Sequence, residues 1–235
     1  MNQETFIQKR NLWLEEVCNQ CHEYALKFDK DFLVFQTPCN NYNPELLIIG
    51  INPGGDTTYS EILNRKGYSK KSPSDLAYDV NTLTTKPYWE SDKDGKKLSK
   101  GADVMRNRLG RIFNTENGLK ETLEKTVMMN MYYLNTPTEK DLTEISNEAK
   151  QYCVKKTIEF IEILNPKNIL FLTSKKWNLN ACNVTDVKKF ENFVKAGQLN
   201  NRKVYAIPHY ASRLGAYSTT NANLIAKTLK NILVS

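Results

Sequence analysis

Four short apolar runs divide the chain, at residues 46–50, 126–132, 168–173 and 203–207. They are rich in Leu, Ile, Val and Met and too short for helices, which is typical of strands buried on both faces of a parallel sheet. Segments with helical spacing separate them. This alternation predicts an α/β fold, in which a central, mostly parallel four-stranded sheet is the middle layer of a three-layer α/β/α sandwich.

Helices are predicted where apolar residues recur every three or four positions. Such spacing covers an N-terminal helix at residues 4–27, then residues 104–113, a long segment at 138–164, and the closing segment 224–233. The third of these stops at Asn165-Pro166, because proline cannot continue a helix.

The long stretch at residues 56–103 has few periodic apolar residues and many Ser, Lys, Asp and Gly residues. We expect a basic, loop-rich insertion there, of a length that is usually functional or partly ordered by a partner. The chain shows no repeat or domain linker, so a single domain over residues 1–235 is expected.

Residues suited to ligand binding follow the first and last apolar runs. The first run leads into a tight loop that contains one polar side chain, Asn52, among glycine and proline residues. The last run ends at Pro208 and leads to His209, one of only two histidines in the chain. Since ligands of open α/β sheets bind beyond the carboxyl ends of the strands, we expect these two side chains to face one pocket.

These two segments resemble motifs of the uracil-DNA glycosylase superfamily. Gly50-Ile51-Asn52-Pro53-Gly54 is similar to the first motif of the mismatch-specific/thymine and single-strand-selective branches. The segment IPHYASR, residues 207–213, is similar to a divergent second motif. It can be aligned with H-P-S-P-R from His209 or with M-P-S-S-S-A-R from Ile207. We prefer the first register, because a histidine at the end of the last strand has a chemical use there.

The resemblance implies an enzyme that hydrolyses the N-glycosidic bond of uracil, or of a related deaminated or modified pyrimidine in DNA, by base flipping and water attack. Asn52 would hold the water, and His209 would donate a hydrogen bond to the base as negative charge grows on it. In the alternative interpretation, Asn52 caps a turn and His209 has only a local partner. The carboxylate of Asp56 is a further catalytic candidate, although the sequence Gly-Gly-Asp is also typical of a simple turn.

The flipped base needs a pocket, a reader and a stacking partner. We expect the backbone of the glycine loop to line the pocket. Asn130, at the end of the second strand, is the predicted reader, because an amide matches the donor and acceptor of uracil or thymine. Asn135 is the fallback, and a strand-end asparagine that only satisfies backbone groups is the alternative. Tyr59 is the predicted stacking aromatic. The loop residues concerned are Gly50, Ile51, Pro53 and Gly54.

Charge adds weak support for a DNA partner. There are 33 Lys and Arg residues against 26 Asp and Glu residues, a net charge of +7, and many of the basic residues fall between the first two strands. A phosphate-binding patch and an ordinary solvated lysine surface both fit this pattern. The residues predicted to contact DNA are Gly55, Lys70, Lys71, Ser212 and Arg213; further basic residues of this stretch are Arg65, Lys66, Lys93, Lys96, Lys97, Lys100, Arg106, Arg108 and Arg111.

The five cysteines suggest free thiols rather than disulfides. Cys18 and Cys21 lie at helical spacing and can be core residues, although with Cys153 they resemble part of the iron–sulfur cluster of one glycosylase branch. The fourth ligand of such a cluster would fall near Leu134, which cannot bind iron. No cofactor or metal is therefore expected.

Neither a secretion signal nor an apolar run long enough to span a membrane is evident. We therefore expect a cytoplasmic monomer that binds DNA and no membrane. A second hypothesis from another functional class is a glycosylase-fold protein that binds nucleic acid with little or no cleavage.

Overall fold

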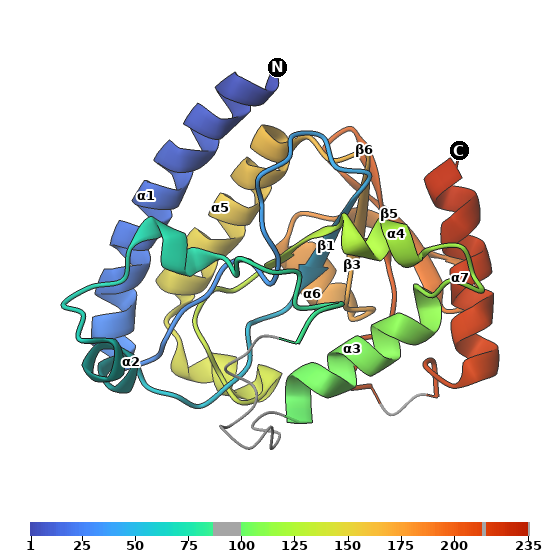
Figure 1. Cartoon of the computed structure of the whole chain (residues 1–235). Coiled ribbons are helices and arrows are strands. Elements are labelled where there is room, and N and C mark those ends of the chain that lie inside the picture. The colour runs from blue at the N-terminus through green and yellow to red at the C-terminus, as the bar shows by residue number, and fades with distance from the viewer. Residues whose placement is uncertain (87–99, 213–214, 235) are drawn as a thin grey trace.

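The computed structural model describes residues 1–86, 100–212 and 215–234 (Figure 1). The fold is mixed α/β, built on a six-stranded sheet in the order β2-β1-β3-β6-β5-β4. The strands are β1 (Leu46–Gly50), β2 (Val127–Asn130), β3 (Asn168–Phe171), β4 (Thr185–Glu191), β5 (Val194–Leu199) and β6 (Arg202–Ala206). The predicted number of four strands is wrong, because a hairpin of two further strands extends the sheet.

The four predicted strands are mutually parallel and adjacent. β1 pairs with both β2 and β3, and β3 pairs with β6. The added strands β4 and β5 are antiparallel to each other, and β5 is antiparallel to β6. Parallel pairing brings the carboxyl ends of β2, β1, β3 and β6 to one rim of the sheet.

The hairpin was missed because its sequence lacks a continuous apolar run. Only Val187 of β4 is even partly buried, and the rest of that strand is exposed. β5 mixes buried, half-buried and exposed positions and contains Gly197. An exposed edge strand of this kind carries little of the hydrophobic signal that marks a buried strand.

Seven α-helices and two short 3-10 helices matter for the arrangement in the described ranges. They are α1 (Gln3–Phe28), α2 (Tyr59–Lys66), α3 (Lys100–Ile112), α4 (Lys120–Glu124), α5 (Asn147–Leu164), α6 (Lys176–Ala181), α7 (Thr219–Val234), η1 (Pro73–Leu76) and η3 (Glu139–Glu144). The predicted insertion at 56–103 is therefore not loop throughout, since it contains α2 and η1. Part of it, residues 87–99, lies outside the described residues and includes Lys93, Lys96 and Lys97.

Both faces of the sheet are covered by helices. Alternate residues of β1 point to opposite sides, so that Leu47 and Ile49 pack with α1 and α5 while Leu46 and Ile48 pack with α3 and α7. Figure 1 shows these two helix pairs on opposite sides of the strands. Burial on both faces explains why the central strands are continuously apolar. Of the helices in the described ranges, none is long and apolar enough to cross a membrane.

Substitution of the glycine in β5 tests the packing of the hairpin. An alanine Cβ at Gly197 would lie 2.7 Å from the Val184 Cγ1 atom and 2.9 Å from the backbone oxygen of Thr185. We expect Gly197→Ala to lower the free energy of unfolding by about 1–3 kcal/mol, because the backbone must shift. Urea denaturation measures this change.

Gly110→Ala in α3 is the matched control. A Cβ there would meet no atom within 4 Å, so the same substitution should raise the free energy of unfolding by about 0.5–1 kcal/mol through helix propensity. Equal effects of the two substitutions would contradict the close approach of β4 to Gly197.

Candidate functional site

The site lies at the carboxyl ends of β1 and β6, which β3 separates in the sheet. The chain holds its sheet-like contacts for a short distance beyond β1. The backbone oxygen of Gly50 accepts a hydrogen bond from the Met131 N–H at 2.9 Å, and that of Ile51 accepts one from Tyr132 at 2.8 Å. The loop that carries Asn52 therefore starts from a fixed position on the rim.

Two glycines give this loop its shape. Gly54 has φ of 76° and Gly55 has φ of 98°, a region that other L-residues rarely adopt. A Cβ at Gly55 would lie 3.6 Å from the side-chain Nδ2 of Asn135. The glycine loop thus passes close to the segment that follows β2. Pro53 and Gly54 are half-buried, and Asp56 is exposed at the end of the loop.

Asn52 is held in one orientation by Thr136. Its Nδ2 donates hydrogen bonds to the backbone oxygen and to the Oγ1 of Thr136, both at 3.0 Å. A backbone oxygen can only accept, so the nitrogen of the amide must face Thr136 and the oxygen must face away. No residue that the structure describes donates a hydrogen bond to Asn52 Oδ1, and this half-buried atom can accept one from a ligand or a water.

His209 is held in one tautomer by its own loop. The backbone N–H of Ala211 donates to His209 Nδ1 at 3.2 Å, so the proton of the neutral ring lies on Nε2. Burial lowers the pKa of His209 to about 4; Glu139 opposes this shift, and the positive charges of Lys175 and Arg108 add to it. The ring is therefore neutral at pH 7. Within the described ranges Nε2 has no hydrogen-bond partner.

The segment from Thr136 to Glu139 acts on both Asn52 and His209. Thr136, which orients Asn52, donates from Oγ1 to the backbone oxygen of Thr138 at 2.9 Å. Glu139 follows directly, and its charge acts on the pKa of His209. Its carboxylate accepts hydrogen bonds from Lys175 Nζ at 2.5 Å and from Asn178 Nδ2 at 2.7 Å. Asn52 therefore contacts this segment directly, whereas His209 is linked to it through the charge of Glu139.

The loop after β6 is braced from both sides. Arg108 donates from Nη1 to the backbone oxygens of Tyr210 and Ser212. The Tyr217 hydroxyl donates to the Pro208 backbone oxygen at 2.6 Å. Ser212 also donates its backbone N–H to the His209 oxygen, at 2.8 Å. These contacts make the loop a rigid support for the imidazole. Arg213, a predicted DNA contact, lies outside the described residues.

The two candidate base readers differ in how their amides are engaged. Asn130 is 1% exposed, and its Nδ2 donates to the backbone oxygens of Leu33 and Val34 at 3.3 and 3.4 Å. This is the backbone-satisfying arrangement that stood as the alternative. The buried Oδ1 of Asn135 has no partner in the described part of the chain, and its amide lies beside the glycine loop. Asn135 is therefore better placed to bind a ligand.

Tyr59 and Lys71 lie inside the protein, so the structure corrects both predictions. Tyr59 is 1% exposed, and its hydroxyl hydrogen-bonds His22 Nδ1 at 2.8 Å, so its ring offers no face to a base. Lys71 is 6% exposed and pairs with Asp31 at 2.5 Å. The carboxylate of Asp31 thus balances the charge of a lysine that the sequence presents as part of a basic run. Lys70 is exposed and donates to Asn19 Oδ1 at 2.6 Å.

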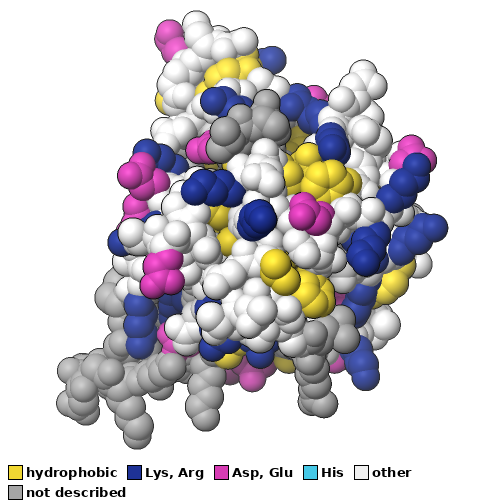
Figure 2. Space-filling view, turned by 90° about the vertical axis from the view of Figure 1, so that its right-hand side faces the viewer, with side chains coloured by type: hydrophobic (Ala, Val, Ile, Leu, Met, Phe, Trp, Pro, Cys, Tyr) yellow, Lys and Arg dark blue, Asp and Glu magenta, His cyan; other side chains and the backbone are white. Residues whose placement is uncertain are grey.

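Several other basic residues in the described part of this stretch are engaged by partners. Arg106 pairs with Asp103 at 2.6 Å, Arg111 donates to the Tyr217 backbone oxygen at 2.6 Å, and Lys66 pairs with Asp75 at 2.8 Å. On the face that carries α7, basic side chains are scattered among acidic ones (Figure 2). This favours a solvated surface over a continuous phosphate-binding track on that face.

The cysteines behave as core residues. All five are buried and free. Burial raises the pKa of Cys21 well above its ordinary value, and a hydrogen bond with Cys153 raises it further. Leu134 belongs to the same core. In the described ranges, no group of three or more His, Cys, Asp or Glu side chains could hold a metal ion.

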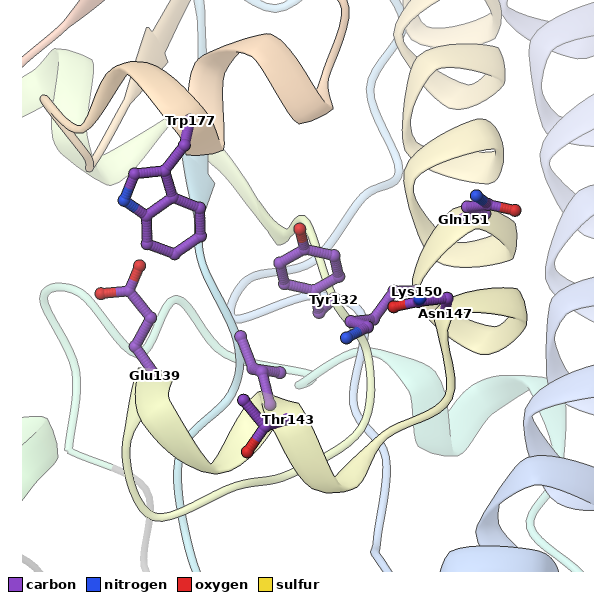
Figure 3. Close-up of a pocket in the computed structure, with 8 residues that line it drawn as sticks. Tyr132, Glu139, Thr143, Asn147, Lys150, Gln151 and Trp177 are labelled. Atoms are coloured by element: carbon purple, nitrogen blue, oxygen red, sulfur yellow. The ribbon is translucent and has the colours of Figure 1, made fainter.

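A cavity of about 290 Å³ opens beside Glu139, between η3, α5 and α6 (Figure 3). The sequence did not predict this cavity or the roles of Thr136 and Glu139, and it presented Arg108 only as one of several basic residues. One signal was present: Thr138 and Asp141 form a capping box at the start of η3, a pattern that marks a helix start and would have located Glu139 at the rim.

Comparison with protein-family models finds no matching family, and comparison with curated proteins finds no match.

The neutral state of His209 makes stability depend on pH. Its pKa is about 4 in the folded protein against an ordinary value of 6.5, so the unfolded chain takes up the proton first as pH falls. The free energy of unfolding should therefore fall between pH 6.5 and pH 4, by about 3 kcal/mol through this group, and be unaffected by it above pH 6.5.

Urea denaturation of the wild type and of His209→Gln at several pH values isolates this effect. Glutamine keeps an N–H donor but does not titrate. We expect the stability of the wild type relative to the variant to decline as pH falls from 6.5 to 4. Parallel pH profiles for the two proteins would show that His209 is not held neutral by burial.

Proposed function

We propose that this chain is a DNA glycosylase that hydrolyses the N-glycosidic bond of uracil or of a related deaminated or modified pyrimidine. In this proposal the fold is a three-layer α/β/α sandwich of the glycosylase type, whose parallel strands β2, β1, β3 and β6 are its common part. Support comes from the two motif-like segments and from the orientation of Asn52 and His209 at one rim of the sheet.

The free oxygen of Asn52 is suited to hold the attacking water. Thr136 occupies the amide nitrogen, so Oδ1 is left to accept a hydrogen bond from the water, which aims a lone pair of the water oxygen at the sugar carbon. As the C–N bond breaks, its electron pair leaves with the base and the sugar becomes oxocarbenium-like. The water oxygen bonds to that carbon and releases a proton to solvent. An amide is no strong base, so this site gains its rate chiefly by positioning.

The free Nε2–H of His209 is suited to stabilise the departing base. Negative charge gathers on the carbonyl oxygen of the pyrimidine, and a preoriented donor in a half-buried site strengthens as that charge develops. A neutral imidazole supplies this donor, and the Ala211 hydrogen bond keeps the proton on Nε2. The base anion then takes a proton from solvent. The amide nitrogen of Asn135 lies beside the glycine loop, and its Oδ1, unpaired in the described part of the chain, is suited to accept from the N3–H of uracil or thymine.

One observation carries the proposal. At the ends of two strands far apart in sequence, an amide and an imidazole are each oriented by a hydrogen bond with a backbone group, and the functional atom of each is left unpaired among the described residues. Such preorientation is what hydrolysis of a glycosidic bond without a covalent intermediate requires.

A substrate panel tests the reaction. Labelled DNA containing uracil, thymine mispairs, hypoxanthine or hydroxymethyl-pyrimidines is incubated with protein, and abasic product is detected as alkali-labile cleavage. We expect product from at least one pyrimidine substrate. His209→Ala should lower the single-turnover rate about 100-fold or more, because one donor to the leaving group is lost. His209→Gln should recover part of that loss.

Asn52→Ala should also lower the rate about 100-fold, since the water loses its anchor. Asn41→Ala is the matched control, because Asn41 is exposed and makes no hydrogen bond in the described part of the chain. Its rate should equal that of the wild type. Salt-sensitive binding with no abasic product on any substrate would refute the enzyme and identify the nucleic-acid-binding alternative.

A further inference from the structure

The cavity beside Glu139 has an aromatic end and a cationic end. Trp177 from α6 and Tyr132 from the segment after β2 supply the rings, and Lys150 from α5 supplies the charge. Figure 3 shows the Trp177 indole above the Glu139 carboxylate, with Lys150 extending from α5 on the other side of the cavity. The remaining lining residues are Leu142, Thr143, Asn147 and Gln151.

The Trp177 ring is exposed and lies beside the ammonium group of Lys175. It is 55% exposed, although tryptophan is usually well buried. Lys175 Nζ lies 5.4 Å from the centre of the ring and bonds the Glu139 carboxylate. Glu139 is itself anchored by Asn178, which is fully buried. An exposed indole at a cavity wall is a platform on which a planar ring can stack.

The cavity carries one unbalanced positive charge. Glu139 and Lys175 form an ion pair and cancel. Lys150 is half-buried, and its side-chain ammonium group makes neither a hydrogen bond nor an ion pair with any residue that the structure describes. A lone ammonium group of this kind suits a phosphate, which it attracts as a point charge. The amide side chains of Asn147 and Gln151 lie next to it and add hydrogen-bonding capacity.

The cavity also adjoins the proposed active site. Tyr132 donates its backbone N–H to Ile51, the residue before Asn52, at 2.8 Å. Glu139 lines the cavity, and its charge also acts on the pKa of His209. A strand that presents a nucleotide to Asn52 and His209 therefore has a neighbouring nucleotide within reach of this cavity.

We propose that the cavity binds one nucleotide unit, its base stacked on Trp177 and its phosphate at Lys150, and that this unit belongs to the strand that carries the flipped base. The inference rests on the proposed function for the identity of the strand. The stacking platform and the unpaired cation support a nucleotide independently of the reaction.

Fluorescence anisotropy of a labelled single-stranded oligonucleotide tests the proposal on the full-length protein. Trp177→Ala should weaken binding about 10-fold, as expected for loss of one stacked base, and Trp177→Phe should retain most of the affinity. Lys150→Ala should weaken binding and lower the slope of log affinity against log salt by about 0.7, the value for one phosphate contact on a single strand. The matched control, Lys155→Ala, changes an exposed lysine of the same helix that does not line the cavity, and should leave affinity and slope unchanged.

Thermal unfolding of each variant establishes that it is folded before its binding is compared. A folded Trp177→Ala or Lys150→Ala variant that binds like the wild type would overturn the proposal. In a second arm, deoxythymidine monophosphate is titrated against the wild type. We expect it to bind at least 10-fold more weakly than the oligonucleotide; equal affinity would overturn the assignment to a strand and indicate a free nucleotide.

Failure of this inference and failure of the proposed function give different results. If abasic product forms and the Trp177 and Lys150 variants bind and cleave like the wild type, the glycosylase stands and the nucleotide site falls. If no substrate gives product while both variants weaken oligonucleotide binding as described, the nucleotide site is supported and the proposed glycosylase activity is contradicted.

Discussion

The hydrogen bonds between the Asn52 amide and Thr136 join the glycine loop after β1 to the segment that leads into η3. This contact does more than orient one side chain. Glu139 follows soon after Thr136, and its carboxylate both acts on the pKa of His209 and lines the cavity that contains Trp177. One short stretch of backbone thus carries the residue that orients Asn52 and the carboxylate that acts on His209 and lines the cavity.

The parallel part of the sheet could be predicted from the sequence because burial on both faces leaves continuous apolar runs. The predicted bounds of β1 match the structure, and those of β2, β3 and β6 differ by a few residues at their ends. The β4–β5 hairpin could not be predicted in the same way. Its stability comes from pairing to β6 and from the close approach at Gly197, neither of which produces an apolar run in the chain.

The candidate site was predictable only in part. Asn52 and His209 could be chosen because each follows a strand end, where topology brings polar groups together. Their partners could not, since Thr136 and Arg108 act through bonds to groups that are distant in sequence. A run of lysines likewise gives no sign that Asp31 neutralises Lys71 inside the core. Position along a strand is local information, whereas electrostatic pairing is tertiary.

Charge pairing also bears on how the rim would recognise a ligand. Although the chain is positively charged overall, Lys175 pairs with Glu139, and Arg108 is engaged by backbone oxygens near His209. Both cations lie close enough to oppose protonation of His209. Burial, which is the main cause of the lowered pKa of His209, together with these two cations keeps the donor neutral. Recognition at this rim must then come from oriented hydrogen bonds and stacking. The lysine of the neighbouring cavity, Lys150, has no charged partner in the described part of the chain and is available for an ionic contact.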